Sequence, residues 1–148
     1  MKPLQDYSFL KGVNHGFERD EAALRRHLGY GKRLGINSVR IWLSYKEFAN
    51  EGAGYVDALR QYIRVCDSEG VTVMPILFNG NGIDPAILEE AFLPEGETFA
   101  KAFVVGVKDE PGLLMWDIMN EPPCNPLIKE APSQEVKDGW YAKIWKYV

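Results

Sequence analysis

Hydrophobic and polar positions along the chain follow two periods in turn, and together they predict repeated helix–strand units. In the first unit, apolar residues recur at the spacing of one helix face until Gly35, and a short β-branched segment follows at 38–43. The second unit has the same order, with Gly70 before a strand at 72–78. The two apolar stripes are Leu24, Leu28 and Leu34, with Asp20 as N-cap, and Val56, Leu59, Ile63 and Cys66. This order is typical of βα units in a parallel sheet.

The rest of the chain supplies two further strands and two further helices. An apolar run at 113–119 suits a strand buried on both faces, and residues 9–14 form a first strand. Helical patterns lie at 99–108 and at 133–148. In the last helix we expect Ser133 as N-cap and five residues facing a core, namely Val136, Trp140, Ile144, Trp145 and Val148.

The spacing of the units indicates the fold class. Gly35 and Gly70 are 35 residues apart. One βα unit of an eight-unit barrel of about 250 residues takes roughly 31 residues. The sequence therefore predicts an α/β fold of the (β/α)8 TIM-barrel type, with about four βα units in the 148 residues, which is a half-barrel. No linker or low-complexity tract marks a second domain.

Composition and charge limit the classes of binding partner to be expected. The chain is 46% hydrophobic and has a net charge of -4, so it lacks the cationic excess used to bind nucleic acid or an anionic membrane. Cys66 and Cys124 belong to no paired motif, so neither a metal site nor a disulfide framework is indicated. No apolar stretch reaches the length of a signal peptide or a membrane span. The compartment stays open, and a secreted or periplasmic location would require that a signal has been removed.

Polar and aromatic residues gather where the predicted strands end. In parallel α/β folds these ends and the loops after them form the active site. The residues at these positions are Asn14, His15, Arg40, Trp42, Ser44, Tyr45, Phe78, Asn79, Asn81, Asn120 and Glu121. We therefore expect a site at the carboxyl edge of the sheet.

The fourth strand carries the most specific motif, WDIMNEP at 116–122. Together with GVN at 12–14 and SVRIW at 38–42, in matching order, it resembles glycoside hydrolase clan A, and most closely the cellulase and mannanase group of family five. The resemblance implies that Glu121 is the acid/base and that Asn120 holds a sugar hydroxyl next to the reacting carbon. It also implies that residues 1–148 form the N-terminal half of a catalytic barrel and that the activity requires no metal or organic cofactor.

Glycosidic bond cleavage explains why two carboxyl groups are needed. A protonated acid donates to the leaving oxygen, and in retaining enzymes a second carboxylate about 5 Å away captures the sugar carbon. By the resemblance that nucleophile would lie on strand seven, which these residues do not include. Asp117 does not fit the role, because it precedes Glu121 by four residues, roughly 13 Å along an extended strand.

The other site residues have alternative interpretations. Arg40 either supports the sugar site or pairs with a buried acid, and Asn14 and His15 either line the site or satisfy local backbone groups. Trp42 can stack on a sugar or fill the core, and Asn79 is a candidate sugar ligand. The exposed edges of a half-barrel favour self-association, so a noncatalytic, self-associating or carbohydrate-binding piece is the alternative function. A flavodoxin-like nucleotide binder is disfavoured, because no glycine-rich loop follows the first strand.

Overall fold

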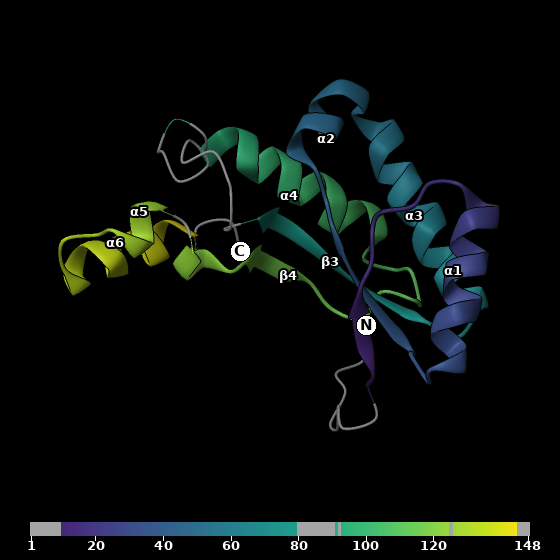
Figure 1. The fold of residues 1–148 in the computed structure, drawn as a ribbon. Helices are drawn as coiled ribbons and strands as arrows, with labels where there is room; N and C mark the ends of the chain where they lie inside the picture. Colours follow the sequence, from purple (N-terminus) through teal and green to yellow (C-terminus); the bar gives the residue numbers. More distant parts are fainter. Residues whose placement is uncertain (1–9, 80–90, 92, 125, 145–148) are drawn as a thin grey trace.

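The computed structural model describes residues 10–79, 91, 93–124 and 126–144. Within these residues the elements alternate along the chain as expected for βα units (Figure 1). They are β1 (Gly12–Asn14), α1 (Glu21–Arg33), β2 (Ser38–Trp42), α2 (Tyr45–Glu51), α3 (Ala53–Ser68), β3 (Thr72–Asn79), α4 (Leu93–Val107), β4 (Asp117–Asn120), η3 (Pro122–Cys124), α5 (Pro126–Lys129) and α6 (Gln134–Ile144).

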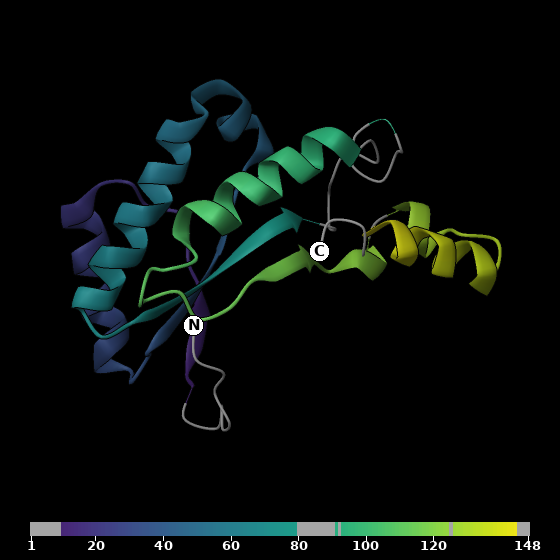
Figure 2. The ribbon, with the colours of Figure 1, turned by 180° about the vertical axis from the view of Figure 1, so that it is seen from behind.

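The four strands form one parallel sheet in the order β1-β2-β3-β4. Helices α1, α3 and α4 lie along one face of this sheet, whereas α5 and α6 extend beyond its carboxyl edge (Figures 1 and 2). None of the described helices covers the opposite face, which we call the inner face. The α/β prediction with four βα units is therefore confirmed.

The helix ends follow from local sequence. Asp20 caps α1 by accepting a hydrogen bond from the Ala23 amide at 2.8 Å, as predicted. Gly35 and Gly70 have φ of 75° and 73°, a left-handed conformation that glycine adopts without a Cβ penalty. The chain can therefore turn from α1 and α3 into the following strands.

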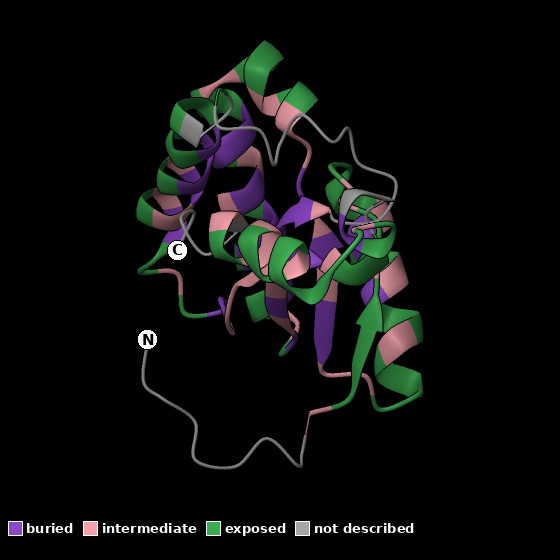
Figure 3. Cartoon of the chain, turned by 90° about the vertical axis from the view of Figure 1, so that its left-hand side faces the viewer, coloured by how far each residue is buried: buried purple, intermediate pink, exposed green. Residues whose placement is uncertain are grey.

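The core lies between the sheet and its helices. Figure 3 shows the buried segments in purple where helices and sheet meet, and exposed segments on the outer helix faces. Phe99 and Phe103 of α4 are fully buried, and their ring centroids are 5.0 Å apart in an edge-to-face arrangement. Burying each such side chain contributes about 1.5–3 kcal/mol. Gly112 permits a close approach to α3, because a Cβ there would lie 3.0 Å from the Ile63 carbonyl oxygen.

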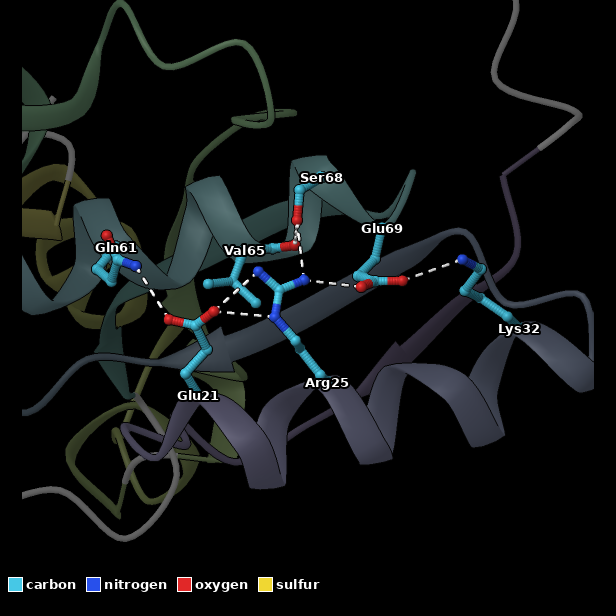
Figure 4. Close-up of polar contacts among 7 residues, drawn as sticks. All are labelled: Glu21, Arg25, Lys32, Gln61, Val65, Ser68 and Glu69. Carbon is cyan, nitrogen blue, oxygen red and sulfur yellow. Dashed lines mark hydrogen bonds and ion pairs between the residues drawn. The ribbon is translucent and has the colours of Figure 1, made fainter.

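Exposed ion pairs join α1 to α3 on the outside of this layer (Figure 4). Arg25 bonds Glu21 and Glu69, and Lys32 bonds the second oxygen of Glu69 at 3.2 Å. Lys32 and then Arg25 lower the pKa of the Glu69 carboxyl. Because these side chains are solvated, water and salt screen the pairs, and they contribute little to stability.

Several boundaries differ from the predictions. Leu34 is 78% exposed, so its place in the buried stripe is wrong: it is the C-cap residue, beyond the last helical turn. The predicted strand at 113–119 is also shorter, because β4 begins at Asp117 and Leu113 makes only an isolated bridge to Val73. Helix α2 was not anticipated, and Phe9 lies outside the described residues.

For the last helix, the structure confirms the predicted N-cap but contradicts part of the predicted buried face. The Val136 amide donates to the Ser133 hydroxyl oxygen at 3.3 Å, as predicted for an N-cap. Val136 itself is 39% exposed, so the expectation that it faces a core is wrong, whereas Trp140 packs against the core. Trp145 and Val148 lie outside the described residues, and nothing described of Ile144 tests its burial. Within the described part of the chain, none of the helices has the length and apolar character required to span a bilayer.

Candidate active site

The inner face places the predicted polar residues side by side at the carboxyl edge of the sheet. In a parallel sheet, residues paired in register point to the same face. Asn14 pairs with Arg40, and Arg40 and Trp42 are two residues apart on β2, so all three share one face. Ile76 links this row to β4, because it pairs with Trp42 on one side and with Asp117 on the other.

Arg40 and Asp117 form an ion pair that spans β3. The Arg40 Nε donates to Asp117 Oδ2 at 3.0 Å, and its Nη2 donates to the same oxygen. The two side chains are 23% and 22% exposed, so the pair is half-buried. A charge in such a place is costly unless it is paired, which explains why an acid occurs within the apolar run of the fourth strand.

Asn120 connects this ion pair to the third strand. The Arg40 Nη2 donates to Asn120 Oδ1 at 2.9 Å, and Asn120 Nδ2 donates to Asn79 Oδ1 at 3.0 Å. Asn120 is only 7% exposed, and Asn79 is its Cα partner in the sheet. We call these four residues, Arg40, Asp117, Asn120 and Asn79, the strand-end network. It brings together three residues that the sequence proposed for the site.

Two further predicted residues lie beside the network. The Arg40 guanidinium carbon is 5.3 Å from the centroid of the Trp42 ring, within the range of a cation–π contact. Trp42 is half-buried, so part of its ring surface remains accessible. Asn14 is exposed at the end of β1 and shares a face with Arg40. The strand-end network therefore has an aromatic ring and a second asparagine beside it.

Glu121 directly follows β4 and has an unusual backbone. Its φ is 48°, and among the described residues it is the only one other than glycine with positive φ. The Glu121 carbonyl accepts a hydrogen bond from the Cys124 amide at 2.9 Å, which closes the short η3 turn. The side chain is exposed at the carboxyl edge. Left-handed backbone costs a non-glycine residue about 1–2 kcal/mol and is concentrated at functional sites.

His15 lies elsewhere. Its Nδ1 is 2.9 Å from the Tyr62 hydroxyl of α3, and its Nε2 is 3.2 Å from Nδ1 of His27 on α1. These contacts place the His15 ring in the helix layer, and its partners are side chains rather than the backbone groups that the alternative named. Burial and the nearby Cys66 raise the pKa of Tyr62 well above its usual value, and burial raises the pKa of the Cys66 thiol to about 12. We call His15, His27, Tyr62 and Cys66 the helix-layer group.

Asp117 is the site residue that sequence reasoning missed. The sequence left open that Arg40 pairs with a buried acid, but it considered Asp117 only as an unsuitable second carboxylate. The sequence did contain a signal for Asp117, because an acid inside an apolar strand requires a charged or hydrogen-bonding partner. Identifying that partner requires the register of three strands. Among the described residues, no group of three or more His, Cys, Asp or Glu side chains could hold a metal ion.

Comparison with solved structures supports the fold. The endo-β-1,4-mannanase from Thermotoga petrophila superposes with a TM-score of 0.66 at 15% identity, covering 93% of this chain and 39% of that chain. At the level of the fold, the chain resembles half of a family 5 glycoside hydrolase barrel. A GH5_18 protein from Streptomyces cattleya, solved in complex with GlcNAc, also has a TM-score of 0.66 at 15% identity, with 93% and 41% coverage.

A fungal structure gives the same result. The endo-1,4-β-mannanase from Rhizomucor miehei has a TM-score of 0.65 at 16% identity, covering 93% of this chain and 52% of that chain. The chain thus spans about 40–50% of the length of these similar structures. No protein-family profile and no curated protein sequence matches the chain.

Proposed function

We propose that residues 1–148 are the N-terminal half of a retaining glycoside hydrolase barrel that acts on β-linked polysaccharides. One observation carries the proposal: a buried, hydrogen-bonded asparagine immediately precedes an exposed glutamate at the carboxyl end of the fourth strand of a barrel-type sheet. Barrel enzymes bind substrate at this edge. The half-barrel fold shared with endo-mannanases supports the same assignment.

In this proposal each residue has a distinct role. Glu121, as the acid/base, donates its proton to the glycosidic oxygen as that bond breaks, and later takes a proton from the attacking water. Asn120 holds the sugar hydroxyl beside the reacting carbon, and Arg40 and Asn14 support it. Asn79 and Trp42 add polar and stacking contacts to the sugar. The nucleophilic carboxylate comes from a strand outside these four, so catalysis requires the complementary half of a barrel.

The names of the similar structures favour one substrate for the first test. The structures from Thermotoga petrophila and Rhizomucor miehei are both endo-mannanases, so β-1,4-mannan precedes β-glucan as the candidate substrate. We would measure release of reducing ends from mannan, and hydrolysis of aryl β-mannosides and β-glucosides. The test compares the chain with its Glu121→Gln variant. Glu130→Gln is the matched control, because Glu130 is also exposed and lies beyond β4.

The outcomes separate catalysis from binding. Activity in the chain and in Glu130→Gln, but not in Glu121→Gln, would support the acid/base role. Activity that survives in Glu121→Gln would overturn it. Because the nucleophile lies outside these four strands, hydrolysis is expected only when a complementary half-barrel completes the site. Absence of activity in that completed form, together with binding of mannotetraose, would favour a noncatalytic carbohydrate-binding half-barrel.

The alternative function has its own supporting observation. β1 and β4 each pair with one neighbour among the described strands, and the inner face carries no described helix. Such edges favour association, with a second copy or with a complementary half-barrel. Sedimentation equilibrium tests this alternative: a concentration-dependent dimer would favour it, whereas a monomer at all concentrations would argue against it.

A further inference from the structure

The carboxylate of Asp117 controls how Arg40 can be placed. Arg40 lies on β2 and Asp117 on β4, so the Arg40 side chain reaches across β3 to make the pair. A long side chain extended over a neighbouring strand loses conformational freedom, and that loss must be offset by the contacts it makes. Two donors, Nε and Nη2, meet the same oxygen of Asp117 and hold the plane of the guanidinium. Asp117 thereby fixes the direction in which the other guanidinium hydrogens point.

Arg40 in turn fixes the polarity of Asn120. A guanidinium can only donate hydrogen bonds, so the group it meets on Asn120 must be the amide oxygen. This agrees with the 2.9 Å contact from Nη2 to Oδ1. The amide nitrogen then points to Asn79, whose oxygen accepts at 3.0 Å. One of the two Nδ2 hydrogens is used there, and the other is what Asn120 can donate to a ligand.

We propose that Asp117 is a positioning residue that acts through Arg40 to hold Asn120 as a hydrogen-bond donor towards the sugar. The inference rests on the proposed function for its consequence in catalysis, but the orientation itself can be tested without activity. Without the Asp117 charge, the guanidinium loses its anchor and the Asn120 amide can flip. A flipped amide would present its oxygen where the nitrogen had been, and would accept where it formerly donated.

The direct test is NMR of the full chain with Asp117→Asn, a substitution that keeps the shape of the side chain and removes its charge. The reporters are the Nδ2 hydrogens of Asn120 and the Nε hydrogen of Arg40, assigned by their loss in Asn120→Ser and Arg40→Lys. We expect both sets of signals to shift, and their exchange with solvent to accelerate by roughly tenfold or more, the factor that corresponds to one charge-assisted hydrogen bond.

Asp57→Asn is the matched control. Asp57 also pairs with an arginine, Arg60, but on α3 and with a side chain that is 66% exposed. This variant should leave the Asn120 and Arg40 signals unchanged. Equal shifts in both variants, or unchanged Asn120 signals in Asp117→Asn, would overturn the proposal. If Asp117→Asn fails to fold, Asp117→Ser provides the second variant, because it also removes the charge, and unchanged Asn120 signals in it would overturn the proposal.

A second readout links the orientation to function. Mannotetraose affinity of the chain, or kcat on mannan where hydrolysis occurs, should fall roughly tenfold in Asp117→Asn, with kcat affected more than KM. Asp117→Glu should restore part of the loss, because it restores the charge. A lower Tm with unchanged affinity, kcat and Asn120 signals would mean a merely structural role. Failure of the proposed function would appear instead as absence of hydrolysis and sugar binding in the unsubstituted chain, while the NMR comparison would still decide the role of Asp117.

Discussion

Asn14 and His15 are consecutive residues, but their side chains lie beside two different groups of polar residues on opposite sides of the sheet. Asn14 pairs in register with Arg40 of the strand-end network, so these two side chains share the inner face. His15 turns to the other side and enters the helix-layer group, where it meets Tyr62 and His27. Both groups contain hydrogen-bonded polar side chains near strand ends. The side chains of Arg40 and Asp117 in the strand-end network are 23% and 22% exposed, whereas Tyr62 and Cys66 in the helix layer are 2% and 0% exposed.

This difference shows that position near a strand end is not sufficient to define a site residue. Side chains alternate between the two faces of a strand, so one residue step decides whether a group meets substrate or helix. We therefore expect substitutions in the helix-layer group to change stability, and substitutions in the strand-end network to change ligand binding. Three predictions test that division.

The largest effect is expected for Tyr62→Ala. This substitution removes a buried ring from the contact between α1 and α3, and large-to-small changes of aromatic residues in cores typically cost about 3–5 kcal/mol. Tyr62→Phe removes only the hydroxyl that contacts His15 and should cost about 1 kcal/mol. Urea unfolding followed by circular dichroism measures both values. If Tyr62→Phe lost sugar binding while folded and equally stable, the helix-layer group would belong to the site and the division would fail.

Alkaline pH should destabilise the helix-layer group by a smaller amount. Burial raises the folded-state pKa of Cys66 to about 12, above its usual value of about 8.5. The folded state therefore keeps a proton that the unfolded state releases, so the stabilisation is fully present below about pH 8.5 and is lost as pH rises towards 12. The raised pKa of Tyr62 acts in the same direction.

The expected loss in the free energy of unfolding is on the order of 2 kcal/mol near pH 10.5. Thermal unfolding between pH 8 and pH 10.5 would show it as a falling Tm. Cys66→Ala is the control: it should start from a lower Tm at pH 8 but decline less steeply. An identical slope in the two proteins would show that Cys66 does not contribute to the pH dependence.

The same comparison explains how far the fold was predictable. Strands β2 and β3 were located because each lies in a compact, mainly apolar run, and the left-handed ends of α1 and α3 were located because each is followed by a glycine. Helix α2 was missed because YKEFANE is too short to show a helical period: only Tyr45 and Phe48 are apolar at helical spacing. They pack on Phe99, a contact that depends on the position of α4.

The sequence predicted most of the residues of the strand-end network but not the contacts that link them. Asn79 and Asn120 were selected because each follows a predicted strand, and Arg40 because it lies within one. The structure joins the three by hydrogen bonds. The link through Asp117 depends on register across β2, β3 and β4, which hydrophobic period alone does not specify. The role of His15 was left open for a related reason: the sequence indicates that it follows the first strand but not the face to which it turns.

The smallest effect is expected at Glu121. It tests whether the backbone at the strand ends is strained, in contrast to the backbone of the helix layer. Because Glu121 has φ of 48°, Glu121→Gly should be more stable than Glu121→Ala, by about 1 kcal/mol, although glycine ordinarily destabilises relative to alanine. Both variants lack the carboxylate, so their difference reports the backbone alone. The control pair is Glu130→Gly and Glu130→Ala, where φ is not positive and alanine should be the more stable residue. If alanine were also the more stable residue at position 121, the left-handed backbone would not cost stability there. The two regions would then differ in exposure but not in strain.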